Sequence, residues 1–325
     1  MKRYEQLLQS LATDDERIVV MTAENRAAIR SLPAQLGQRF IDVGICEQTL
    51  LGVAAGLAVR GRLPVVHALA AFLTMRGFEF IRTDIGIAHL PVILVGGVPG
   101  LLSDGNGPTH QAIEDIGLMR AIPGMAVIAP ADEEELLAAL SAAVKFGGPC
   151  YVRYYDGPPV TNHTGTYQLG EAETLGDASA DVAIATYGHL VSEAVRAQAL
   201  LDHVGVTACV LNMRTIAPLD EACVRRSAVS NQLLVVLEDH LQTGGLFSAI
   251  AEQLAVARLP SNLLPLNLKN NWFRPGTFED VLHGTGLCAQ LVAEAILNHW
   301  EKNDGKRVNR HAGLPVHRSL ELDLG

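Results

Sequence analysis

The chain has 325 residues, of which 49% are hydrophobic, and its 35 acidic side chains outnumber 25 basic ones to give a net charge of −10. This length exceeds one ordinary hydrophobic core and predicts two domains. The acidic balance provides no basic stripe for a phosphate backbone, so nucleic acid is excluded as an expected partner, and small molecules or proteins remain.

The cysteines and the N-terminus bear on the compartment. Cys46, Cys150, Cys209, Cys223 and Cys288 are scattered singly, without the pairs that would indicate a disulfide framework or a zinc or iron–sulfur site. No stretch has the length of a membrane span, and the charged N-terminus is unlike a signal peptide. We therefore expect a soluble cytoplasmic chain that binds no membrane.

Residues 1–160 alternate between helical and strand patterns and predict a first α/β domain. Apolar spacing predicts helices in the regions 1–16, 49–58, 72–82 and 132–144, and runs of Val, Ile and Leu predict strands at 18–21, 40–43, 63–69, 90–95, 125–130 and 150–154. Continuous apolar runs are typical of parallel sheets covered on both faces, whose ligands gather at the carboxyl ends of the strands.

The composition then changes and the alternation resumes. Residues 161–179 are rich in Gly, Thr, Asn and acidic side chains and predict a linker. Residues 180–300 predict a second α/β domain, with strands at 181–186, 207–211 and 233–237, and residues 301–325 predict a charged, disordered tail. The expected fold is therefore α/β, with two parallel-sheet domains in tandem.

Two segments of the first domain stand out as candidate functional segments. In residues 40–58, Glu47 falls in the first turn of a helix of small residues, and apolar neighbours such as Leu50 and Leu51 would desolvate its carboxyl group and favour a proton donor. Alone, this pattern fits a helix-capping glutamate better. Residues 96–115 form a long glycine-rich loop with a polar end, and such loops in compact domains are functional or disordered.

Five motifs in order resemble one family. They are Phe-Ile-Asp-Val-Gly-Ile-Cys-Glu-Gln at 40–48, Ala-Ala-Phe-Leu-Thr-Met-Arg at 70–76, Asn-Gly-Pro-Thr-His-Gln-Ala-Ile-Glu-Asp at 106–115, Ile-Ala-Pro-Ala-Asp-Glu at 128–133 and Leu-Glu-Asp-His-Leu-Gln-Thr-Gly-Gly-Leu at 237–246. The chain resembles the pyrimidine-binding and C-terminal domains of transketolase, and is similar to the smaller subunit of a split, two-subunit transketolase. The resemblance implies that the first domain binds the pyrimidine half of thiamine diphosphate.

The resemblance implies cofactor contacts for four residues. Glu47 matches the glutamate that hydrogen-bonds the aminopyrimidine ring and drives its tautomer change, and Phe72 matches the aromatic residue that stacks on this ring. Leu69 replaces the first aromatic residue of the pyrimidine pocket, and Glu24 stands in place of an active-site aspartate. Without the neighbouring motifs, Phe72 would be read as a core phenylalanine.

The resemblance also implies substrate contacts. His110 matches an active-site histidine suited to proton transfer, although a structural loop histidine is the alternative. Arg153 matches an arginine that grips the substrate phosphate, but a structural salt bridge is nearly as well supported. Asn106 replaces an aspartate of this site. His67 lies where the family has a small residue beside the cofactor, and a buried structural role is the stronger expectation for it.

Two further departures affect the same region. Ala28 replaces a serine that contributes to phosphate binding, and Val98 replaces a histidine. Both changes remove groups that hold a phosphorylated sugar, so the resemblance does not define the substrate.

The 325 residues contain no Gly-Asp-Gly motif followed by Asn, through which the family binds the cofactor's diphosphate and its Mg2+. No metal ligand is therefore expected in this chain. The resemblance implies a separately encoded diphosphate-binding N-terminal subunit as partner, a heterotetramer with two copies of each subunit, and a chain that is inactive alone.

The leading hypothesis is a subunit of a thiamine-diphosphate-dependent enzyme that moves a two-carbon ketol unit from a ketose donor to an aldehyde acceptor. A decarboxylating carboligase that uses a 2-oxo acid such as pyruvate is the alternative with the same cofactor. A degenerate regulatory paralogue is the non-enzyme alternative, and a ferredoxin-linked 2-oxoacid oxidoreductase subunit is a further one.

Overall fold

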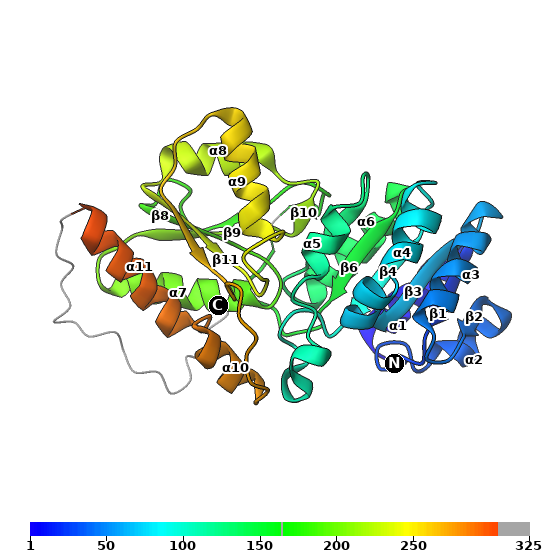
Figure 1. Ribbon diagram of the computed structural model, residues 1–325. Helices are drawn as coiled ribbons and strands as arrows, with labels where there is room; N and C mark the ends of the chain where they lie inside the picture. Colours follow the sequence, from blue (N-terminus) through cyan, green and yellow to red (C-terminus); the bar gives the residue numbers. More distant parts are fainter. Residues whose placement is uncertain (164, 305–325) are drawn as a thin grey trace.

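The computed structural model describes residues 1–163 and 165–304, which form two α/β domains side by side (Figure 1). Of the expected tail, residues 301–304 complete the last helix, and residues 305–325 lie outside the described part of the chain.

The first sheet has seven strands in the order β10-β5-β6-β4-β3-β1-β2, and every pair but β10 with β5 is parallel. Its own-domain strands are β1 (Ile18–Thr22), β2 (Phe40–Asp42), β3 (Leu63–Leu69), β4 (Ile93–Gly97), β5 (Ala126–Ile128) and β6 (Cys150–Tyr154). Nearly all residues of the inner strands are buried, as a parallel sheet covered on both faces requires.

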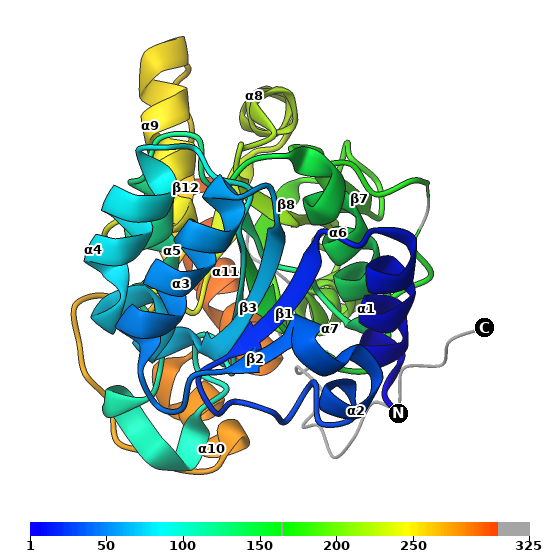
Figure 2. The same cartoon turned by 90° about the vertical axis from the view of Figure 1, so that its right-hand side faces the viewer.

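Helices cover both faces of this sheet (Figure 2). One face packs against α1 (Arg3–Asp14), α2 (Leu32–Leu36) and α6 (Glu133–Phe146), and the other against α3 (Glu47–Val59), α4 (Phe78–Phe80) and α5 (Asp115–Arg120). Two π-helical segments, η2 (Phe72–Arg76) and η3 (Ile81–Gly86), flank α4, and 3-10 turns lie at η1 (Gly37–Arg39) and η4 (Asp104–Thr109). Asp132 caps α6, because its carboxylate accepts the Glu135 N–H at 3.0 Å.

The second domain is a five-stranded sheet in the order β12-β11-β8-β9-β7. Its strands are β7 (Glu173–Leu175), β8 (Val182–Thr186), β9 (Ala208–Asn212), β11 (Leu233–Leu237) and β12 (Leu263–Leu266), and its helices are α7 (Leu190–His203), α8 (Glu221–Ser230), α9 (Leu246–Ala257), α10 (Phe278–Thr285) and α11 (Ala289–Asp304). None of the helices in the described part combines the length and apolar character that crossing a membrane demands.

The boundary between the domains differs from the expected linker at 161–179. Residues Glu173–Leu175 are strand β7, which pairs antiparallel with β9, so the second sheet begins inside the expected linker. Strand β10 (Thr215–Ala217) follows β9 in the chain but pairs antiparallel with β5 of the first sheet. Because one domain lends a strand to the other, the domains share a continuous hydrophobic core.

A buried ion-pair network closes the junction between the domains. The two ring nitrogens of His163 lie 2.8 Å from the Asp132 carboxylate and 2.7 Å from the Glu173 carboxylate. Arg214 lies 2.9 Å from Glu135 and 2.7 Å from Glu173. Hydrogen bonds to Asp132 and then to Glu173 raise the pKa of His163 to about 10, so its imidazolium ties α6 to β7 at neutral pH.

Replacing His163 tests this network. Because the folded-state pKa lies above the unfolded value, the imidazolium's stabilisation is fully present below about pH 6.5 and is lost as the pH rises through about 10. We expect His163→Gln to lower the free energy of unfolding by roughly 3 kcal/mol at pH 6, and this difference to shrink as the pH approaches 10. Urea denaturation across this range measures it, with the exposed His203→Gln as control; a difference that stays constant with pH contradicts the assignment.

Candidate active site

Three segments carry the candidate site, and each follows the carboxyl end of a strand of the first sheet. Strand β2 leads through Gly44, at φ +74°, into α3. Strand β3 leads into the helix that contains η2, and β4 leads into the long loop before α5. Isolated π-helical turns occur frequently at functional sites, and carboxyl ends of parallel strands are the usual place for ligands.

Glu47 is the first residue of α3, and only 2% of it is exposed. Its carboxylate accepts a hydrogen bond from the Arg76 guanidinium, at 2.9 Å between Oε2 and Nη1. Leu50 and Leu51 are fully buried, as the sequence pattern predicts, whereas Ile45 is 71% exposed and does not desolvate the carboxyl group. The apolar residues that follow Glu47 in α3 are therefore buried with it, whereas the residue before the helix is not. The guanidinium of Arg76 forms an ion pair with the Glu47 carboxylate.

Phe72 and His110 lie next to this pair. The Phe72 ring is half-buried at the start of η2 and meets the His110 ring edge-on, with 5.0 Å between centroids. The Arg76 guanidinium also lies over the Phe72 ring, with Cζ 4.4 Å from the ring centroid. Thr109 holds His110 by a 2.9 Å contact between its hydroxyl and Nδ1. Glu47, Arg76, Phe72 and His110 thus form one cluster.

Arg76 is the member of the cluster that the sequence analysis missed. It stands inside the motif at 70–76, four residues after Phe72. Residues four apart on a helix share a face, so this spacing could have placed Arg76 beside Phe72, but its contact with Glu47 required the fold.

The other expected cofactor and substrate residues lie outside this cluster or at its border. Leu69 ends β3 and is half-buried. Glu24 is exposed at φ +61°, and its N–H donates to the Asp42 carboxylate at 3.1 Å. Asn106 is exposed and donates from its amide to the Ser103 hydroxyl at 3.2 Å. Within the described residues, no hydrogen bond or ion pair joins Glu24 or Asn106 to Glu47.

Arg153 is buried between the carboxylates of Asp115 and Asp239. Its side chain is 3% exposed and makes ion pairs of 2.8 Å with Asp115 and 2.7 Å with Asp239. A further donor reaches the Ala112 carbonyl at 3.1 Å. With its donors directed at two carboxylates and a carbonyl, the guanidinium favours the salt-bridge alternative over a grip on phosphate.

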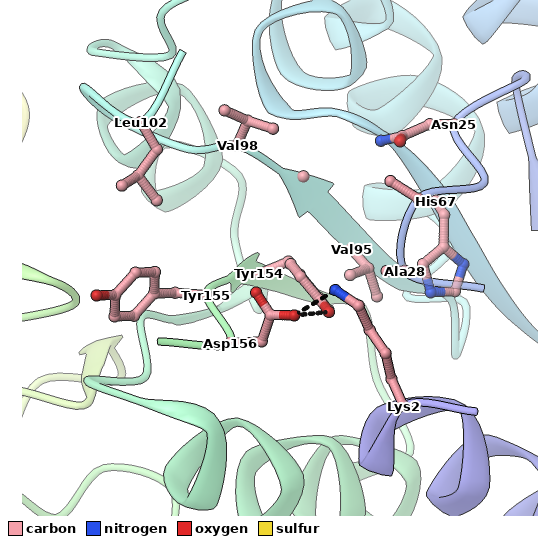
Figure 3. A pocket seen from close by; sticks show the side chains of 12 residues that line it. Lys2, Asn25, Ala28, His67, Val95, Val98, Leu102, Tyr154, Tyr155 and Asp156 are labelled. Carbon is pink, nitrogen blue, oxygen red and sulfur yellow. Dashed lines mark hydrogen bonds and ion pairs between the residues drawn. The ribbon is translucent and has the colours of Figure 1, made fainter. Parts of the chain in front are cut away.

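His67 is buried in β3 but borders a pocket (Figure 3). The Tyr4 hydroxyl lies 2.9 Å from its Nε2, and burial lowers its pKa to about 4, so the ring is neutral at physiological pH. The pocket has a volume of about 320 Å³ and is lined by Lys2, Asn25, Ala27, Ala28, His67, Val95, Gly97, Val98, Leu102, Tyr154, Tyr155 and Asp156. Its walls include His67 of β3 and residues of the loop after β4, two segments that also lead to the cluster.

The cluster fits the pyrimidine half of thiamine diphosphate. It offers a buried carboxylate as hydrogen-bond acceptor and a half-buried aromatic ring, which suit an aminopyrimidine. Among residues 1–163 and 165–304, one group of side chains has the spacing of metal ligands, as the Mg2+ that accompanies the diphosphate would require. Ligand atoms of Glu135, His163 and Glu173 lie within 4.8 Å of one another, but Arg214 and the protonated His163 already counter these carboxylates.

Comparison with known proteins identifies the family. Residues 1–156 match the pyrimidine-binding domain of transketolase, and residues 170–292 match the transketolase C-terminal domain. The chain is 36% identical over 296 residues to the 6-deoxy-6-sulfo-D-fructose transketolase subunit SqwH of Clostridium sp. (strain MSTE9), with 90% of this chain and 91% of that protein covered. The chain therefore belongs to the transketolase family, which confirms the expected family and its two α/β domains.

Two other relatives differ in length. The chain is 37% identical over 297 residues to 1-deoxy-D-xylulose-5-phosphate synthase of Thioalkalivibrio sulfidiphilus, but spans only 45% of that protein. A solved structure described as a split gene transketolase, an inactive beta4 tetramer, is 32% identical at a TM-score of 0.83, with 91% of this chain and 96% of that one covered. The chain thus spans under half of the synthase and nearly all of the split transketolase chain.

A double-mutant cycle tests the contact between Glu47 and Arg76. Arg76→Met leaves a buried carboxylate without its cation, and we expect the free energy of unfolding to fall by about 1–2 kcal/mol, a value reduced by the partial exposure of Arg76. In a Glu47→Gln background the same change should cost less than about 0.5 kcal/mol. Urea denaturation measures both, with the exposed Arg82→Met in η3 as control; equal losses in both backgrounds argue against the pair.

Proposed function

We propose that this chain is one subunit of a thiamine-diphosphate-dependent, transketolase-like enzyme that moves a two-carbon ketol unit from a ketose donor to an aldehyde acceptor. The observation that carries the proposal is the buried Glu47 carboxylate in contact with Arg76 and close to Phe72 and His110, in a chain of the transketolase family. Free thiols at all five cysteines fit a reducing cytoplasm, where we expect the enzyme to work.

Each residue of the cluster has a role suited to its chemistry. Thiamine diphosphate, when bound, supplies the carbon nucleophile that carries the two-carbon unit. Glu47 holds the aminopyrimidine by a hydrogen bond and exchanges a proton at its carboxylate. Phe72 offers its ring face to the aminopyrimidine, and His110 exchanges protons with the hydroxyl or carbonyl groups of the sugar.

The proposal includes a partner. A separately encoded subunit would bind the diphosphate and Mg2+, and two copies of each subunit would form a heterotetramer. In support, the relative from Clostridium that matches nearly the whole chain is named a transketolase subunit, and the split gene transketolase tetramer, made of one type of chain, is described as inactive. Leu69 and Glu24 complete the expected cofactor contacts, and Asn106 the substrate contacts.

The Glu47 assignment is tested in the complex assembled with the partner. We expect Glu47→Gln to lower kcat for ketol transfer by about 10²-fold or more, because the amide keeps the size of the side chain but cannot exchange the proton. The rate of ketol transfer from a ketose to an aldehyde measures this loss, and the exposed Glu79→Gln in α4 is the control. Unchanged turnover in Glu47→Gln would make the catalytic assignment wrong and support the degenerate regulatory paralogue.

The decarboxylating alternative has its own support. The 37% identity to a 1-deoxy-D-xylulose-5-phosphate synthase over 90% of this chain leaves a 2-oxo acid such as pyruvate as a donor. Ala28 stands where the family has a serine that contributes to phosphate binding, and this replacement is compatible with a ketose donor and with a 2-oxo acid donor.

Release of carbon dioxide separates the two donors. The assembled complex receives pyruvate or a ketose as sole donor with the same aldehyde acceptor. We expect product from the ketose and no carbon dioxide from pyruvate, and the reverse pattern supports the carboligase. An absorbance spectrum of the same complex decides the ferredoxin-linked alternative, which requires iron–sulfur clusters in the partner.

A further inference from the structure

The pocket in Figure 3 lies over the centre of the first sheet. Its walls come from the carboxyl ends of four adjacent strands, with Asn25 following β1, His67 on β3, Val95 on β4 and Tyr154 on β6. Its volume of about 320 Å³ falls in the range of roughly 300–1,000 Å³ typical of small-molecule sites. The loop after β4 also carries His110, so one loop contributes to both the pocket and the cluster at Glu47.

The lining of the pocket has no net charge. Its two charged side chains, Lys2 and Asp156, form an ion pair of 2.7 Å with each other. The Tyr154 hydroxyl donates to the same Asp156 oxygen at 2.8 Å. An incoming phosphate that approached the Lys2 ammonium would therefore also meet a carboxylate (Figure 3).

The other walls are apolar or neutral. Ala28, Val95, Val98 and Leu102 present hydrocarbon, and His67 carries no charge at physiological pH. Within the described ranges, the Asn25 amide makes no hydrogen bond to another residue, which leaves this polar group open to a ligand.

A phosphate in such a pocket would lose water without gaining a free cation. Anionic groups are bound where charged donors replace their hydration, usually arginine forks, lysines or helix N-termini. Hydroxyl groups need only neutral donors and acceptors, and the carbon chain between them packs against apolar walls.

The geometry points to a subsite for an uncharged, polyhydroxylated carbon chain, so that the distal end of the sugar handled by this enzyme is a hydroxyl group and not a phosphate. This inference rests on the proposed ketol transfer for its place in the reaction, and on the lining of the pocket for its ligand class.

Binding is tested separately from turnover. Saturation-transfer NMR on the assembled complex compares erythritol with erythritol 4-phosphate, which differ only in the phosphate. We expect erythritol to bind at least about tenfold more tightly, and Ala28→Phe, which fills the pocket, to abolish this binding while the exposed Ala88→Phe leaves it intact. Tighter binding of the phosphate, or no binding of either probe, overturns the inference.

The charge argument has a second test that does not depend on the folding of Ala28→Phe. Asp156→Asn frees the Lys2 ammonium and gives the lining one positive charge. We expect this change to lower the ratio of the dissociation constants of erythritol 4-phosphate and erythritol by about fivefold. Asp14→Asn removes the same charge at an exposed position and should leave this ratio unaltered. An unchanged preference in Asp156→Asn contradicts the charge argument.

Kinetics then connect the pocket to the reaction. When the same ketose supplies the two-carbon unit to both acceptors, kcat/KM of the complex should be higher for glyceraldehyde than for glyceraldehyde 3-phosphate. A preference for the phosphorylated acceptor overturns the inference and leaves ketol transfer established. Erythritol binding without turnover of either acceptor supports the pocket and refutes the proposed function.

Discussion

The packing of the two domains against each other depends on the buried ion pairs of the Arg153 guanidinium. Arg153 lies at the end of β6 with 3% of its side chain exposed, and it bonds Asp115 at the start of α5 and Asp239 after β11. A buried guanidinium is tolerated only when its donors are matched, and two carboxylates with the Ala112 carbonyl meet that condition here. Removing any partner would leave a charge buried without compensation in the junction between the sheets.

The contact of the second domain with the first through Asp239 also positions the loop of the candidate site. Gly100 and Ala112 exchange backbone hydrogen bonds of 3.0 and 3.2 Å, which closes the loop that carries His110. Gly100 has φ +58°, and a Cβ there would lie 1.5 Å from the Asp239 carboxylate, so only glycine lets the second domain approach so closely. The second domain therefore contributes to the site by fixing the loop on which His110 sits, against Phe72 of the first domain.

These contacts explain what the sequence could and could not predict. The motifs at 40–48, 70–76 and 106–115 are local features, so their resemblance to one family was enough to group Glu47, Phe72 and His110 in one expected site. The role of Arg153 could not be settled, because Asp115 and Asp239 lie 38 and 86 residues away and phosphate would suit the same guanidinium. The three residues of β10 have no local pattern that assigns them to the sheet of the other domain.

The ion pairs of Arg153 differ in exposure from the ion pair of Arg76, and the difference matches their tasks. Arg153 is enclosed, so exchanging its partners would require opening the domain junction. The Arg76 side chain is 44% exposed while its partner Glu47 is buried, so solvent screening weakens this pair and the guanidinium can turn to water at small cost. Glu47 is therefore held in place by a partner that it can exchange for another hydrogen-bonding group, on a scaffold that the buried ion pairs of Arg153 hold rigid.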